Sequence, residues 1–215
     1  MKKFAVILAG CGVYDGAEIH EAVLTLLAID QLGGSYDIFA PDVAQAHVIN
    51  HLTGEAMAEQ RNVLVESARI ARGRISNLSE FDSLQYDALV FPGGFGVAKN
   101  LCSFAFQGAD CTVNPLVEKA IKDMHKASKP IGAMCISPVM IAKVLQKTIV
   151  TIGNDEGTMS AISEMGASPK IAAVHEVVVD KTNKIVTTPC YMLDVTIKQI
   201  ANGAHNLISE IYRLF

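Results

Sequence analysis

The feature that most constrains the fold is a strand, helix, strand pattern at the start of the chain. Residues 3–9 (KFAVILA) form an apolar run that is closed by a glycine-rich turn. Residues 17–34 then carry apolar side chains at helical spacing and end in two glycines, and residues 35–41 (SYDIFAP) predict a second strand. Such a unit implies parallel strands with helices on both faces of a sheet.

The same alternation returns after residue 82, so we predict one α/β domain over residues 1–215. The segment 42–82 is less regular and is interpreted as an insertion that packs on the main sheet. Within it, residues 47–60 predict a hairpin or an extended excursion, and residues 61–73 predict a short amphipathic helix. The later patterns predict strands at 86–91 and 130–134 and helices at 114–129 and 137–145. They also predict two strands around a turn at 180–183, with His175 and Glu176 in the first strand, and a long helix over 192–214.

Composition excludes several classes of function. The net charge of -4 indicates neither a nucleic acid nor an anionic membrane as partner. The apolar run at the start is too short for a signal segment or a membrane span, so the expected location is the cytoplasm. Five cysteines without a CxxC spacing argue against a disulfide framework or structural zinc.

Three turns sit where predicted strands end. They are GCGVYDG at 10–16, PGGFG at 92–96, and the position of Cys135 after the strand PIGAM. Ligands bind at the carboxyl ends of strands in open α/β sheets. If these strands are neighbours, the three turns converge on one site.

Cys135 is the first candidate within that site. A strand-to-helix turn presents its side chain as a nucleophile elbow does. Amides of the following helix, such as that of Ile136, favour the thiolate and should lower the pKa of the thiol. The alternative is a buried structural cysteine that closes a strand.

The PGGFG turn is the second candidate. Glycine lets the backbone approach a reacting atom, and the amide of Gly94 is the expected donor of an oxyanion hole. A tight turn without any catalytic role explains the glycines equally well. The spacing matches neither a dinucleotide fingerprint nor a P-loop.

The third candidate is AEIHE at 17–21, where Glu18 and Glu21 share a helix face and His20 lies between them. Acidic residues in a first turn are ordinary partners of the helix dipole. If one of them faces Cys135, its carboxyl should hold a proton beside the thiolate and act as a general acid/base. His20 could then line the pocket.

The other histidines do not form a convincing catalytic triad with Cys135. We expect no metal, because His47 and His51 could share an ion only if the segment between them were helical. The remaining histidines lie apart in the sequence, at positions 125, 175 and 205.

Nearly the whole chain resembles the ElbB (enhancing lycopene biosynthesis) proteins, which are glyoxalase-like members of the PfpI, class I glutamine amidotransferase-like superfamily. The resemblance implies a flavodoxin-like three-layer sandwich, a homodimer and a reactive elbow cysteine at Cys135. It places the glutamate best at Glu21, with Glu18 as the alternative, and the oxyanion glycine at Gly94. The matching stretches are ILAGCGVYDGAEIHEAVLTLLAI, VINHLTGEAM, RNVLVESARIARG, PGGFGVAKNL, MCISP and KTNKIVTTPCYML.

The chain departs from the proteases and amidotransferases of that superfamily. The proteases carry a histidine directly after the cysteine, where this chain has Ile136, and the late His-x-Glu pair of the amidotransferases has no counterpart here. The resemblance therefore implies a glutathione-independent glyoxalase that converts glyoxal to glycolate without a cofactor, with deglycase-like activity as a related possibility.

A different class of function stays open at this stage. An accessible Cys135 of low pKa would suit a redox sensor or a stress-linked binding protein. A link to isoprenoid metabolism rests on the family name alone.

Overall fold

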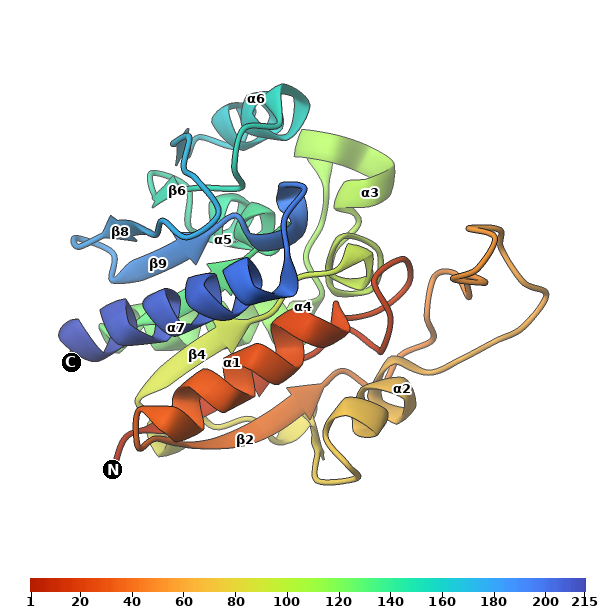
Figure 1. The fold of residues 1–215 in the computed structure, drawn as a ribbon, viewed down its shortest axis with the longest axis horizontal. Helices are drawn as coiled ribbons and strands as arrows, with labels where there is room; N and C mark the ends of the chain where they lie inside the picture. The colour runs from red at the N-terminus through yellow and green to blue at the C-terminus, as the bar shows by residue number, and fades with distance from the viewer.

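Seven strands form a mostly parallel sheet with helices on both faces in the computed structural model, which describes residues 1–215 (Figure 1). Only β8, at one edge, runs antiparallel to its neighbour. This architecture confirms the α/β, flavodoxin-like fold class. In order across the sheet, the strands are β3 (Ser76–Asn77), β2 (Ser35–Ala40), β1 (Lys3–Ile7), β4 (Ala88–Phe91), β5 (Ile131–Met134), β9 (Ile185–Thr188) and β8 (Val178–Asp180).

The helices lie in two layers around the sheet (Figure 1). Helices α1 (Ile19–Gln31) and α7 (Ile197–Arg213) pack side by side on one face, and α4 (Pro115–Lys126) and α5 (Pro138–Leu145) cover the other. The remaining elements are α2 (Val63–Ile70), α3 (Phe104–Gln107), α6 (Glu156–Glu164), the short helical turns η1 (Leu78–Glu80), η2 (Ser83–Gln85), η3 (Val97–Leu101), η4 (Gly108–Asp110) and η5 (Cys190–Met192), and a small second sheet of β6 (Ile149–Val150) and β7 (Ser168–Pro169).

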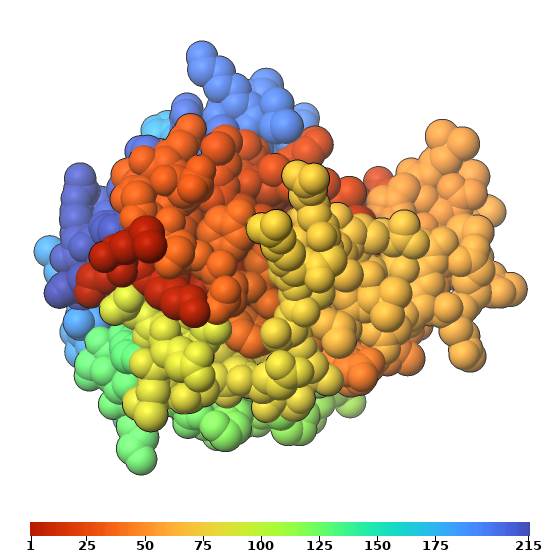
Figure 2. Space-filling model, turned by 90° about the horizontal axis from the view of Figure 1, so that it is seen from below, coloured from red at the N-terminus to blue at the C-terminus, as the bar shows by residue number.

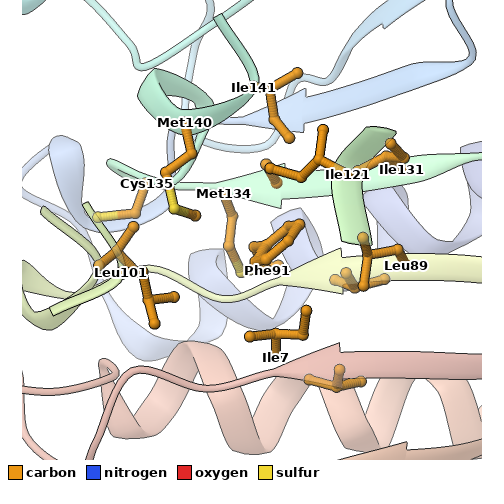
Figure 3. Close-up of a cluster of buried hydrophobic side chains, with 14 of the residues drawn as sticks. Ile7, Leu89, Phe91, Leu101, Ile121, Ile131, Met134, Cys135, Met140 and Ile141 are labelled. Atoms are coloured by element: carbon orange, nitrogen blue, oxygen red, sulfur yellow. The ribbon is translucent and has the colours of Figure 1, made fainter. Parts of the chain in front are cut away.

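The core lies between the central strands and these two layers. Apart from Lys3, the residues of β1, β4 and β5 are buried, which explains why their sequences are continuous apolar runs instead of alternating ones. Figure 3 shows Ile7, Phe91 and Ile131 from the strands packing with Ile121 of α4. Burial of these strands on both faces fixes the sheet and leaves its loop ends as the accessible part.

The register of the central strands brings their carboxyl ends to one level. Val90 of β4 pairs with Val6 of β1 on one side and with Gly132 of β5 on the other, and Gly132 pairs with Val186 of β9. The turns that follow these four strands therefore meet at the same edge of the sheet.

Segment 42–82 only partly matches the predicted insertion. Its residues 44–62 form a hairpin-like arm with two isolated antiparallel bridges, and residues 51–60 are all exposed, so the arm projects from the body (Figures 1 and 2). The predicted helix is present as α2. The segment also supplies β3, which pairs with β2 and belongs to the main sheet.

Other predicted bounds were wrong. The last helix begins at Ile197 and not at residue 192, because Thr196 and Gln199 form a capping box there. His175 and Glu176 precede β8 and lie outside any strand. The helix α6 and the small sheet were not predicted, since their segments have weak periodicity. None of the helices is both long and apolar enough to cross a membrane.

Candidate active site

The turns after β1, β4 and β5 converge, as the sequence predicted. The loop 10–16 and the turn 92–96 are tied together by backbone hydrogen bonds, one of which runs from the amide of Phe95 to the carbonyl of Val13 at 2.8 Å. Cys135 follows β5, the next strand in the sheet. The adjacency of the strands, set by the register, is what brings these distant segments to one site.

Cys135 occupies a strained strand-to-helix elbow. Its φ of +58° is left-handed, a conformation that costs a non-glycine residue about 1–3 kcal/mol and persists only where the surroundings fix it. The Cys135 amide donates to the Thr188 carbonyl at 3.0 Å, and α5 begins three residues later at Pro138. The hydroxyl of Ser137 donates to the Pro92 carbonyl at 2.7 Å and locks the turn against β4. Figure 3 shows Cys135 at the end of β5, at the margin of the core.

Glu21 is the carboxyl that meets the sulfur. Its side chain is fully buried, and its Oε2 and the Cys135 sulfur lie on either side of Gly93, within 2.6 and 3.0 Å of where a Cβ atom at that residue would be. Its Oε2 accepts from the Gly93 amide at 2.9 Å, and its Oε1 accepts from the Tyr191 amide at 3.1 Å. The two backbone donors come from the turns after β4 and β9, so the carboxyl is clamped between strands that lie on either side of β5.

The close approach of these groups requires glycine at position 93. A Cβ atom at Gly93 would lie 2.3 Å from the Cβ of Cys135 and 2.6 Å from Oε2 of Glu21. Any side chain there would separate the thiol from the carboxyl.

Gly94 and Ile136 bring two backbone amides to the sulfur. Both amides lower the pKa of the Cys135 thiol, in opposition to burial. Gly94 has a φ of +105°, and a Cβ atom at this position would lie 2.4 Å from both the Glu18 nitrogen and the Gly16 oxygen. The structure thus brings together Cys135, Gly94 and Ile136, as the sequence predicted, with two amides aimed where an oxyanion would form.

Burial controls the protonation of this pair. It raises the pKa of Glu21 to about 8, with the charge of Glu18 adding to the rise and the amides of Tyr191 and Gly93 opposing it. Burial also raises the pKa of the Cys135 thiol well above its ordinary value, and the Glu21 charge adds to that rise. The prediction of a lowered thiol pKa was wrong, because burial outweighs the Gly94 and Ile136 amides. The raised pKa of Glu21 agrees with the predicted protonated carboxyl, but the predicted thiolate beside it does not follow, because the pKa of the thiol is raised as well.

Glu18 and His20 make contacts with groups other than the sulfur. Glu18 is the N-cap of α1, and its Oε2 accepts from the Glu21 amide at 2.7 Å. It therefore takes the helix-capping role that the sequence left open, and Glu21 takes the place beside Cys135. His20 is half-exposed, and its Nδ1 lies 2.9 Å from the hydroxyl of Tyr191.

Histidines outside this region make contacts elsewhere. His51 bonds to the amide of Tyr14 and the carbonyl of Ile49 in the projecting arm, and His47 packs against Phe106. No group of three or more His, Cys, Asp or Glu side chains is arranged to hold a metal ion.

The sequence did not predict two contributions to the site, which are the Gly93 amide and the turn after β9. In that turn Cys190 is buried with a φ of +46°, and the next residue, Tyr191, directs its amide at Glu21. The strand pattern that stops at Pro189 was a usable signal, since it marks a fourth strand end at the same edge of the sheet.

Comparison with known proteins gives strong matches over almost the whole chain. The chain is 46% identical over 222 residues both to the ES1 protein homolog, mitochondrial, of Rattus norvegicus and to the glutamine amidotransferase-like class 1 domain-containing protein 3, mitochondrial, of Homo sapiens. Each match covers 99% of this chain, and 84% and 83% of the two relatives. No family model matches the chain.

A solved structure also matches the chain over almost its whole length. The isoprenoid biosynthesis protein with amidotransferase-like domain from Ehrlichia chaffeensis superposes with a TM-score of 0.92 at 36% identity, covering 99% of this chain and 100% of that one.

The names of the relatives contradict the predicted cytoplasmic location, since both are mitochondrial proteins. The prediction rested on reading the first residues as a strand. That strand exists as β1, but a strand at this position carries no information about the compartment.

The buried carboxyl generates a prediction for stability. The pKa of Glu21 rises from an ordinary value of 4.5 to about 8 on folding. The folded state therefore holds the proton more tightly, and the contribution of Glu21 to stability is full below pH 4.5 and is lost as the pH rises through about 8. Wild type should lose roughly 3–5 kcal/mol of unfolding free energy through this group between pH 5 and 9.

Glu21→Gln removes that loss. At pH 5 the variant should be less stable by about 1–3 kcal/mol, because its amide leaves one backbone donor without an acceptor. The deficit should shrink or reverse by pH 9. Urea midpoints across this range measure the effect, with Glu164→Gln on exposed α6 as control. Parallel stability curves for wild type and Glu21→Gln would contradict the raised pKa.

Proposed function

Because the chain belongs to the family of ES1 and glutamine amidotransferase-like class 1 domain proteins, we propose that its site is that of a glutathione-independent glyoxalase, which converts glyoxal to glycolate without a cofactor. The observation that carries the proposal is the buried contact between the Glu21 carboxyl and the Cys135 thiol, flanked by the amides of Gly94 and Ile136. A carboxyl with a pKa of about 8 is suited to moving protons at neutral pH.

The first step joins the thiol to one aldehyde. In the reactive form the pair has lost one proton, and the Glu21 carboxylate takes the proton of the Cys135 thiol as the sulfur attacks the carbonyl carbon. The amides of Gly94 and Ile136 hold the developing oxyanion. Glu21 then returns the proton to that oxygen, which gives a hemithioacetal.

The next steps are an internal redox reaction that needs no external electrons. The Glu21 carboxylate removes the hydrogen from the sulfur-bearing carbon and, through an enediol, delivers it to the neighbouring carbon. The first carbon is thereby oxidised to a thioester and the second is reduced to a hydroxymethyl group. Water cleaves the thioester and releases glycolate and the free thiol. Removal of early glyoxal adducts from amines would use the same groups.

Two features of the site argue against the alternative of a redox sensor. Sensor cysteines are accessible and have a low pKa. Cys135 is only 8% exposed, and burial raises the pKa of its thiol. The link to isoprenoid biosynthesis is part of the name of the Ehrlichia chaffeensis protein and is not proposed for this chain.

The enzymatic proposal predicts glycolate formation from glyoxal without glutathione. Cys135→Ser should lower kcat/KM by at least about 1,000-fold, because the nucleophile is lost. Glu21→Gln should lower it by about 100-fold or more, because the proton carrier is lost. Cys111→Ser, which changes a buried thiol in a different loop, is the control and should retain activity. Equal rates for wild type and Cys135→Ser would refute the proposed nucleophile.

We also propose that the chain forms a homodimer, which the family resemblance implies. Ile19, Val23 and Leu27 form an apolar stripe on α1 and are 43%, 47% and 44% exposed. Beside this stripe, β3 pairs with β2 only at Phe39 and Ala40, so the start of β2 has a free outer edge. A second copy related by a twofold axis could cover the stripe and pair the two β2 edges antiparallel, which removes both exposed features.

Light scattering tests this arrangement. Wild type should show twice the chain mass of 23.0 kDa, and Val23→Glu should shift it toward the monomer because the charge is placed in the apolar stripe. Ile171→Glu, at an exposed position before β8, is the matched control and should not change the mass. A monomeric wild type would exclude the homodimer.

A further inference from the structure

The proposed reaction places charge on two oxygens, and the groups described so far serve only one of them. The amides of Gly94 and Ile136 face the sulfur and can hold the oxygen of the carbon that Cys135 attacks. In the enediol step, negative charge also develops on the oxygen of the second carbon. A donor for that oxygen must lie near Glu21, since Glu21 moves the proton between the two carbons.

Tyr191 has its backbone beside Glu21 and extends its side chain toward His20. Its backbone amide donates to Oε1 of Glu21 at 3.1 Å, and its hydroxyl lies 2.9 Å from Nδ1 of His20. His20 directly precedes Glu21 in α1. Tyr191 is therefore fixed to the start of α1 at both its backbone and its side chain.

The exposure of these groups increases from Glu21 outward to His20. Glu21 is fully buried, Tyr191 is partly buried, and the His20 side chain is 50% exposed. A small ligand that reaches Glu21 from this side would pass the pair of His20 and Tyr191.

The hydroxyl of Tyr191 is able to donate to such a ligand. When Nδ1 of His20 carries the hydrogen and donates to the Tyr191 oxygen, the phenolic hydrogen is free. Burial, together with the charges of Glu18 and Glu21, raises the pKa of Tyr191, so the phenol keeps this hydrogen at neutral pH.

We propose that Tyr191, oriented by His20, donates a hydrogen bond to the oxygen on the second carbon of the substrate, and that the site consequently selects 1,2-dicarbonyl compounds over simple aldehydes. This inference rests on the proposed function. It makes Tyr191 a catalytic residue and His20 a positioning residue.

The test compares Tyr191→Phe with wild type and with Tyr212→Phe, a control near the end of α7 whose hydroxyl has no hydrogen-bond partner. One readout is kcat/KM for glyoxal, and the other is protection of Cys135 from iodoacetamide by glyoxal and by propionaldehyde, which lacks the second oxygen. Tyr191→Phe should lower kcat/KM for glyoxal by about 10–100-fold. Protection by propionaldehyde should stay within about twofold, because no hydrogen bond to it is lost.

His20→Ala should reproduce part of the loss of kcat/KM for glyoxal and leave the protection of Cys135 by propionaldehyde unchanged. His20→Gln, whose side-chain amide can still donate to the Tyr191 oxygen, should restore part of the rate. Such a rescue is not expected if His20 acts only through general stability.

Two results would overturn the inference. One is a kcat/KM for Tyr191→Phe within about twofold of wild type, and the other is an equal weakening of protection by both aldehydes, which indicates a structural role. If wild type does not turn over glyoxal, the proposed function fails, and the role of Tyr191 is then decided by the protection of Cys135 from iodoacetamide alone. Glyoxal must then protect Cys135 better in wild type than in Tyr191→Phe, and equal protection rejects the role of Tyr191.

Discussion

The site depends on one buried contact, in which the Glu21 carboxyl lies against the Cys135 thiol and accepts from two backbone amides. Burial of an ionisable pair disfavours charge on either member, so the pair retains its protons at neutral pH. This state is reactive only when one proton leaves, and the amides of Gly94 and Ile136 are then placed to stabilise the charge that reaches the substrate oxygen. The burial that disfavours charge on Glu21 therefore also sets the pKa at which Glu21 can carry a proton.

The parallel sheet makes this contact possible. Neighbouring strands β4, β5 and β9 end at one level, and each contributes one part: the Gly93 amide, the thiol of Cys135 and the Tyr191 amide. Helix α1 contributes the carboxyl, and its N-cap at Glu18 fixes which residue of the first turn points inward. Left-handed backbone at Cys135 and at Cys190 orients the two turns, and the surrounding hydrogen bonds maintain that strain.

The sequence was sufficient for the fold class and for the convergence of the three turns, because apolar runs, glycines and Pro138 mark strand ends directly. It left Glu18 and Glu21 as alternatives, since the two share a helix face and the sequence does not fix where the helix begins. The hydrogen bonds from the Gly93 and Tyr191 amides to Glu21 could not be read from it, because every residue except proline carries such an amide. The direction of the Cys135 pKa shift depends on how completely the turns enclose the sulfur, which is a tertiary property.

Infrared titration of the carboxyl groups tests the central claim most directly. The account predicts that wild type at pH 7 shows a protonated carboxyl band that disappears with a midpoint near 8 and is missing in Glu21→Gln. If wild type shows no such band at pH 7, Glu21 is ionised in the resting site. The raised pKa, and with it the proposed exchange of a proton between Glu21 and Cys135, would then be contradicted.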